Sequence, residues 1–168
     1  MKWYFASRMR HKEAIDKIVN FLKSQNHEVA YEWPKLGSIK PYKENSKRSS
    51  LVAKEISISL KDVDIFVLIT DEAGTDMFIE LGIVIGRWLD NNKTKIYAVG
   101  KFNDRSLMHF HPAIKRVDKL SDVFSIECPE FLTRGGAALL TSFDPHLTGI
   151  IHNSSLRSEL TGGKIFYC

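Results

Sequence analysis

The sequence has few cysteines and no long apolar run. Its 168 residues include two cysteines, Cys128 and Cys168, too few for the disulfide framework of a small secreted domain. No stretch approaches the ~18 consecutive apolar residues of a membrane-crossing helix. The first residues, with strand-like Trp3, Tyr4 and Phe5, do not resemble a signal peptide. We therefore expect a cytoplasmic protein in a reducing compartment, with no membrane partner.

The chain also lacks a strong excess of one charge. It has 24 Lys and Arg against 20 Asp and Glu, a net charge of +4. The basic residues are scattered, apart from small clusters at residues 8–12 and at Lys47 and Arg48, and no DNA- or RNA-binding motif is legible. This distribution suits an anionic small molecule at least as well as a nucleic acid, so no polymer partner is expected.

Apolar runs of strand length alternate with segments of helical periodicity. No internal repeat is visible, and the length fits one domain with a real core. The alternation predicts an α/β fold with a mostly parallel sheet of about five strands and right-handed crossovers. Expected strands are residues 3–7, 28–33, 64–70, 95–100 and a short one at Val117; expected helices are 12–24, 46–61, a helix from about Asp76 to about Asn91, and 121–126, the last as helix or strand.

Two segments have no clear periodicity. Residues 35–45 combine Gly37, Pro41 and several lysines, and this loop is long enough to serve as a lid or specificity loop. From residue 128 the chain is rich in Gly, Ser and Thr, with helical periodicity only at Ala137–Leu140. We therefore expect a domain over residues 1–127. Residues 128–168 are expected to form a C-terminal extension, either loosely packed or docked on a neighbouring subunit.

Glu80 is the one charged residue in the otherwise apolar segment 77–86. On a helix, Ile83 and Val84 lie one turn after it, where a solvent-facing Glu would often find Lys or Arg. We therefore expect Glu80 in the first turn of a helix and directed into a semi-enclosed cleft. The segment follows a predicted strand, and open α/β sheets bind ligands beyond the carboxyl ends of their strands. The alternative is that Glu80 only complements the helix dipole.

Three motifs of the sequence occur together in this order. The first is Tyr-Phe-Ala-Ser-Arg at residues 4–8, and the second is Gly-Thr-Asp-Met-Phe-Ile-Glu-Leu-Gly at residues 74–82. The third is His-Pro at residues 111–112, leading into Arg-Val-Asp-Lys-Leu at 116–120. Together they resemble the nucleoside 2-deoxyribosyltransferase family, including its 2′-deoxynucleoside 5′-phosphate N-hydrolase branch. The similarity covers residues 2–126 and implies a flavodoxin-like three-layer sandwich that cleaves an N-glycosidic bond through a covalent intermediate, without a cofactor.

The resemblance assigns Glu80 the role of the nucleophile that captures the sugar C1′. An acid must help the base depart, and Asp71 is the first candidate, with Asp76 second. A turn or cap role for Asp71 is the alternative. In the same turn, Gly74 supplies backbone freedom and Thr75 or Asp76 is expected to begin the helix; all three match the motif and are expected to bind substrate.

Four further residues are candidate substrate contacts. Ser7 and Arg8 match the positions where the family binds the sugar or a 5′-phosphate, and a hydroxyl with a guanidinium suits that task. A solvated basic helix start is the alternative for this pair. Tyr4 and Trp33 are candidates for stacking on a base, although aromatic residues in strands more often belong to the core.

No metal site is expected from the sequence. His109 and His111 have a spacing found among metal ligands, but no Cys or carboxylate cluster accompanies them.

Two other functions remain open from the sequence. One is a nucleotide-sensing module of the same fold that binds without turnover, and the other is an NAD-cleaving enzyme. Transfer to a second base and hydrolysis by water share the first half-reaction, so the sequence does not separate them.

The chain is expected to form a homodimer or higher homo-oligomer. The predicted helices 46–61 and 76–91 carry more apolar residues than one core-facing stripe can bury. A symmetric partner would cover this excess, and the C-terminal residues are the rival cover within one chain.

Overall fold

A computed structural model of the chain describes residues 1–141, 143 and 144. Five strands form one sheet in the order β2-β1-β3-β4-β5, and every neighbouring pair is parallel. This order and the layers of helices described below are those of a flavodoxin-like α/β fold, as the sequence predicted. The strands are β1 (Lys2–Ala6), β2 (Glu28–Val29), β3 (Ile65–Ile69), β4 (Lys95–Val99) and β5 (Ile114–Val117).

The central strands are buried on both faces, which explains why they read as continuous apolar runs. All five residues of β3 are buried, and β1 is buried from Trp3 onward. Trp3 aligns with Ile65, and the register continues to Ala6 beside Leu68. The carboxyl ends of β1 and β3 therefore lie side by side.

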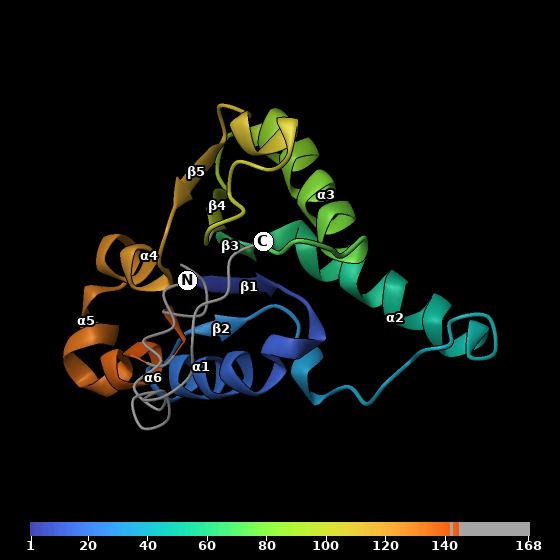
Figure 1. Cartoon of the computed structure of the whole chain (residues 1–168), viewed down its shortest axis with the longest axis horizontal. Helices are drawn as coiled ribbons and strands as arrows, with labels where there is room; N and C mark the ends of the chain where they lie inside the picture. The colour runs from blue at the N-terminus through green and yellow to red at the C-terminus, as the bar shows by residue number, and fades with distance from the viewer. Residues whose placement is uncertain (142, 145–168) are drawn as a thin grey trace, which may run out of the picture.

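Helices cover both faces of the sheet (Figure 1). Trp3 and Phe5 point from β1 into the cluster formed with α1, α4, α5 and α6, and Tyr4 points into the cluster on the α3 side. The helix α2 leads away from the body toward the loop of residues 36–45 (Figure 1). The helices are α1 (Lys12–Ser24), α2 (Ser46–Ser59), α3 (Asp76–Asn91), α4 (Leu120–Glu127), α5 (Pro129–Phe131) and α6 (Ala137–Thr141).

The predicted strand 28–33 is shorter than expected. Pairing ends at Val29, with one further backbone bond from the Ala30 amide to the Trp3 carbonyl at 2.8 Å. Trp33 and Pro34 begin a 3-10 turn, Trp33–Lys35, because proline has no amide hydrogen to continue the ladder.

The first residues of the expected C-terminal extension pack into the core, as far as that extension is described. Cys128, Phe131, Leu140 and Phe143 all lie in the core beside α1 and α4. Asp144 is buried and accepts a hydrogen bond from the Leu120 amide at 2.8 Å. Residues 128–144 therefore complete one face of the sheet, whereas residues 145–168 lie outside the described part of the chain.

The glycines near residue 135 were interpreted as a sign of loose packing, but Gly136 lies where the backbone passes close to a buried ring. A Cβ on Gly136 would lie 2.2 Å from a ring carbon of Phe131. Only glycine lets the backbone pass the buried ring at this distance. Tight packing, rather than looseness, explains the composition here.

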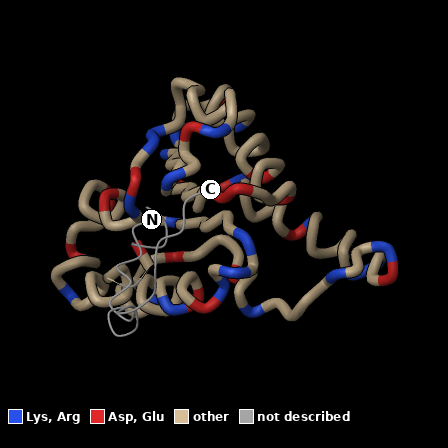
Figure 2. Tube along the Cα trace, in the orientation of Figure 1, with Lys and Arg blue, Asp and Glu red and all other residues tan. Residues whose placement is uncertain are grey.

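Charges of both signs are mixed along the described part of the chain (Figure 2). Figure 2 shows Lys and Arg interspersed with Asp and Glu along the trace. Within the described residues, no helix has both the length and the apolar character needed to cross a bilayer.

Candidate functional site

The site lies where the order of the strands reverses. β2 follows β1 on one side and β3 lies on the other, so the carboxyl ends of β1 and β3 flank the switch point of the sheet. Ser7 and Arg8 follow β1 directly, and Asp71 comes two residues after the end of β3. This crevice is where open α/β sheets bind ligands.

Asp71 is the centre of a buried ion-pair network. Its side chain is fully buried, and the Arg8 Nη1 donates to one carboxylate oxygen at 3.0 Å. The Arg10 Nη2 lies 2.6 Å from the other oxygen. The Arg105 Nη1 donates to the Asp71 backbone carbonyl at 3.0 Å, and the Ala73 amide donates to the carboxylate at 3.3 Å.

This network argues against the predicted role of Asp71 as the acid. Burial alone would raise the pKa of Asp71, but the bond from Arg8, the Ala73 amide and the charge of Arg10 outweigh it and lower that pKa. A carboxyl group held ionised cannot donate a proton to a departing base near neutral pH. Asp71 instead anchors the strand ends together, and it does not line the pocket described next.

A pocket of about 670 Å³ opens beside this crevice. Its walls come from the end of β1, the turn at Trp33, the loop of residues 36–42 and one side each of α2 and α3. Most of the lining is apolar, and the volume is in the range of small-molecule sites. The polar side chains on its wall include Ser7, Lys40, Tyr42, Ser49, Asp76 and Glu80.

Glu80 lines this pocket from the second turn of α3. The helix begins at Asp76 with Thr75 as the N-cap residue, so Glu80 lies beyond the first turn where it was expected. Because the helix dipole acts mainly within the first turn, it is a weak reason for a carboxylate at this position. The position on the pocket wall is the stronger account of Glu80.

The environment of Glu80 raises its pKa to about 7. Burial is the main cause, and the negative charge of Asp76 one turn earlier adds to it. A hydrogen bond from the Tyr4 hydroxyl acts in the opposite direction by stabilising the carboxylate. The group is thus poised to be ionised and only weakly solvated near neutral pH.

Tyr4 has a different role from the one expected. It is fully buried in β1, and its ring stacks on Phe66 with centroids 5.6 Å apart. No face of the ring is open to a base. Its hydroxyl, whose pKa is raised by burial and by Glu80, keeps its proton and donates to that carboxylate.

The remaining predicted residues divide into two groups. Ser7, Trp33 and Asp76 line the pocket, and the Trp33 indole is held in place because its Nε1 donates to the Phe5 carbonyl at 2.6 Å. Gly74 and Thr75 lie in the exposed turn before α3 and are not part of the lining. Gly74 adopts a φ of +121°, which explains the glycine.

Arg8 contacts Asp71 and the turn before α3 and does not line the pocket. Its side chain is 39% exposed and pairs with Asp71, and its Cγ would contact a Cβ placed on Gly74 at 3.4 Å. Arg8 thus holds the turn before α3 against the end of β1. It has further guanidinium donors besides the paired Nη1.

Three contributors were missed from the sequence. Tyr42, from the loop between Trp33 and α2, donates its hydroxyl to Asp76 at 2.7 Å and so closes one side of the pocket. Arg10 and Arg105 hold Asp71. The length of the loop was a signal for Tyr42, whereas nothing in the spacing connects Arg105 with Asp71.

The two histidines with ligand-like spacing do not converge. The fully buried His109 ring stacks on Phe78, with centroids 5.8 Å apart. The His111 Nδ1 accepts from the Ala113 amide at 3.2 Å, and its ring contacts Trp88 edge-on. Both are accounted for by packing around α3.

Comparisons with known proteins find likenesses in structure but none in sequence. No protein-family model matches the sequence, and no curated protein matches it significantly. Among solved structures, the chain is similar to the CMP N-glycosidase BcmB of Clostridium botulinum, with a TM-score of 0.49 and 15% identity, covering 78% of this chain and 99% of that chain. A likeness at this level says nothing about the chemistry of this chain, and the fold class rests on its own sheet order.

Proposed function

We propose that the chain cleaves the N-glycosidic bond of 2′-deoxynucleosides or their 5′-monophosphates, with Glu80 as the nucleophile. The observation that carries this proposal is the Glu80 carboxylate, which lies on the wall of a largely apolar pocket at the switch point of the sheet with its pKa raised to about 7. The motif resemblance to nucleoside 2-deoxyribosyltransferases assigns the same residue the same role.

Glu80 has the properties that the first half-reaction needs. A carboxylate oxygen attacks C1′ as the C1′–N bond breaks, and the base leaves with the electron pair of that bond. Partial desolvation leaves the carboxylate reactive, and the Tyr4 hydroxyl fixes its direction. The developing positive charge at C1′ then lies beside a carboxylate that lines the pocket from the second turn of α3.

Asp76, rather than Asp71, is the carboxylate on the pocket wall that contacts the departing base, and the base takes its proton from water. Asp76 lines the same pocket and receives a hydrogen bond from Tyr42. It stands one helical turn before Glu80, and its charge contributes to the raised pKa of Glu80. We assign to Asp76 the contact with the base, directly or through a water molecule.

The pocket suits a nucleotide in shape and polarity. Trp33, Val52, Ile56 and Ile83 provide apolar walls for a base and a sugar ring, and Ser7 offers a hydroxyl beside the end of β1. Lys40 lines the pocket and supplies a positive charge from the loop. Lys40 is therefore the expected contact for a 5′-phosphate, whereas Arg8 is not part of the lining.

The second half-reaction regenerates Glu80. Water attacking C1′ of the glycosyl ester gives the free sugar, and an incoming base gives a new nucleoside. Both routes break the ester bond and return the carboxylate. The acceptor decides between hydrolase and transferase.

Incubation of the purified chain with nucleosides, deoxynucleosides and their 5′-monophosphates, with and without a second base, tests the proposal. We expect release of free base or base exchange, and a glycosyl adduct on the peptide that contains Glu80 after acid quenching. Glu80→Gln should lower turnover by at least about a thousandfold, because it removes the nucleophile.

Glu13→Gln is the matched control, since Glu13 is an exposed residue of α1. It should retain the parent rate. Binding without base release across the panel would favour a sensing module, and nicotinamide release from NAD alone would favour the NAD-cleaving alternative. Near-parental turnover of Glu80→Gln would refute the mechanism.

A further inference from the structure

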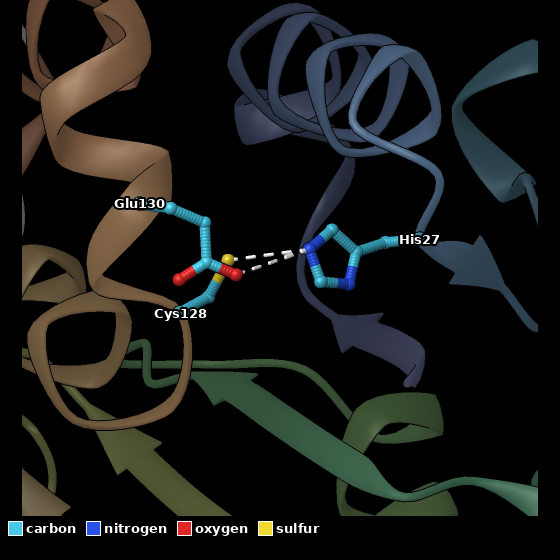
Figure 3. A group of neighbouring side chains, drawn as sticks. All are labelled: His27, Cys128 and Glu130. Atoms are coloured by element: carbon cyan, nitrogen blue, oxygen red, sulfur yellow. Dashed lines mark hydrogen bonds and ion pairs between the residues drawn. The ribbon is translucent and has the colours of Figure 1, made fainter.

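Three side chains from distant parts of the sequence meet on the side of the molecule opposite Glu80. His27, Cys128 and Glu130 each place one potential ligand atom within 4.8 Å of the others. The Cys128 Sγ lies 3.3 Å from the His27 Nε2, and the Glu130 Oε1 lies 3.9 Å from the same nitrogen. Figure 3 shows all three side chains directed toward one point.

We propose that His27, Cys128 and Glu130 form a binding site for a zinc ion. A thiolate, an imidazole nitrogen and a carboxylate are the ligand types that Zn²⁺ takes in proteins, with bonds of about 2.3, 2.0–2.1 and 2.0–2.2 Å. Tetrahedral geometry with such bonds separates neighbouring ligand atoms by about 3.4–3.6 Å. The observed separations of 3.3 and 3.9 Å differ from this by a few tenths of an ångström.

The backbone holds the three ligands in place from two turns. His27 follows Asn26, whose φ of +63° ends α1 and turns the chain into β2. Cys128 is the residue between α4 and α5, and Pro129 fixes the start of α5 so that Glu130 lies on the same side as the thiol. An ion here would connect the α1–β2 turn to the α4–α5 turn, across 101 residues of sequence.

Burial favours one ion with one open coordination position. Cys128 is 1% exposed and the His27 side chain is 11% exposed, whereas the Glu130 side chain is 44% exposed. Two ligands are thus fixed by the core, and the third closes the site from the solvent side. A water molecule would complete four-coordination on the open side.

A catalytic thiol is the competing interpretation of the cluster, and burial argues against that role. Cys128 is 1% exposed, and reactive cysteines are at least partly exposed, whereas buried structural cysteines are inert. On zinc binding, the thiol proton leaves to solvent as the Zn–S bond forms.

The location gives the ion a structural role. His27 lies before the amino end of β2, whereas the Glu80 pocket lies beyond the carboxyl ends of the strands. The ion would not contact the substrate proposed above. Its effect would be to fasten residues 128–144 to the body of the domain.

Zinc titration of the full chain, reduced and stripped with a chelator, tests the site. The titration is best done in a Cys168→Ser background, which leaves Cys128 as the one thiol of the chain. We expect one Zn²⁺ per chain in competition with a chromogenic chelator, and a thiolate-to-metal charge-transfer band when Co²⁺ replaces Zn²⁺. At a free zinc concentration of about 100 times Kd, the melting temperature should rise by about 5–10 °C.

Two variants separate the site from adventitious binding. Cys128→Ser should weaken zinc binding by more than about a hundredfold and abolish the Co²⁺ band, and Glu130→Gln should weaken it by about 10–100-fold. Since the Glu130 side chain is partly exposed, Glu130→Gln should fold normally even if Cys128→Ser does not. Glu28→Gln, a carboxylate next to His27 but outside the cluster, is the matched control and should bind like the parent.

Failure to bind zinc at micromolar concentrations would overturn the proposal and leave a hydrogen-bonded thiol and imidazole only. Binding that is equally strong in Glu130→Gln and Cys128→Ser would also overturn it. The readouts are metal content, absorption and melting temperature, so the outcome is independent of whether the Glu80 pocket turns over a nucleoside.

Discussion

The two faces of the sheet differ in how completely helices cover them. On one face, Trp3, Phe124 and Phe131 form a continuous aromatic stack, with ring centroids 5.2 and 3.8 Å apart. On the other face, α2 buries only Val52, and the apolar side chains of Leu51 and Ile58 are more than half exposed. Within the described residues, helices close one face, whereas the other is open around the pocket.

One face of the sheet thus provides most of the packing that stabilises the fold, and the other face provides the candidate functional site. β1 serves both faces, because alternate residues of a strand point to opposite sides. Phe5 enters the closed core, whereas Tyr4 reaches Glu80. The burial that raises the pKa of Glu80 works against folding, and the closed face has the packing energy that can offset it.

Phe131→Ala should have the largest effect on stability and tests whether the closed face depends on residues beyond 127. Phe131 is fully buried and contacts Phe21 edge-on at 4.9 Å in addition to Phe124. Loss of the ring should lower the free energy of unfolding by about 3–5 kcal/mol, measured by chemical denaturation.

Leu107→Ala is its control, since Leu107 is 87% exposed, and should change the free energy of unfolding by less than about 0.5 kcal/mol. A loss below about 1 kcal/mol for Phe131→Ala would restore the view that residues 128–144 are an appended extension.

Glu80→Gln should make the open face more stable while it removes activity. Because the folded pKa is raised from 4.5 to about 7, the folded state holds the proton of Glu80 to higher pH than the unfolded state does. Stability therefore falls as pH rises through this window. The amide removes that penalty, which the pKa difference limits to about 3 kcal/mol.

We expect Glu80→Gln to unfold at higher denaturant than the parent at about pH 8 and at the same denaturant below about pH 4, where both side chains are neutral. Equal stability of the two proteins at high pH would mean that Glu80 is solvated, and the comparison between the two faces would then lose its energetic basis.

The sequence was sufficient to predict the elements with strong periodic signals. The β1 and β3 strands and α1 were predicted almost to the residue, because buried parallel strands and an amphipathic helix leave strong periodic signals. Glu80 was singled out because a charge in an apolar helix is anomalous, and it lies on the pocket wall; its role as the nucleophile stays a prediction.

The failures share a physical cause. The function of Asp71 depends on Arg10 and Arg105, which only the folded chain brings together. Gly136 was interpreted as a loop signal because its neighbour Phe131 is visible only in three dimensions. The sequence separation of His27 and Cys128 conceals their contact in the same way.

Tyr4→Phe tests whether the side of β1 that faces the pocket controls the pKa of Glu80, and we expect it to change activity less than Glu80→Gln does. Removal of the hydroxyl takes away the one hydrogen bond that lowers the pKa of Glu80. A bond to a charged group contributes about 1.5–3 kcal/mol, so the pKa of Glu80 should rise by about one to two units. The rise of kcat/KM with pH, centred near 7 in the parent, should then shift to higher pH by the same amount.

Turnover of Tyr4→Phe should approach that of the parent once Glu80 is ionised. Phe5→Leu, a change on the closed side of the same strand, is the control that should leave the pH profile in place. An unshifted profile in Tyr4→Phe would show that another group sets the pH dependence.

The smallest free-energy change is expected on the outer side of α2, where the open face is predicted to meet a second copy. Leu51 and Ile58 are seven residues apart, so they share one side of the helix, and neither lines the pocket. Leu51→Ser with Ile58→Ser should change the unfolding free energy of a single chain by less than about 0.5 kcal/mol per site, because both side chains are exposed.

The same pair of substitutions should dissociate the predicted homodimer, which sedimentation at low micromolar concentration would detect as a shift to 19.2 kDa. Leu107→Ser, on an exposed turn elsewhere, should sediment like the parent. A parent that already sediments as a monomer would show that the open face is not a dimer interface, and the apolar side of α2 would then need a cover from within the chain.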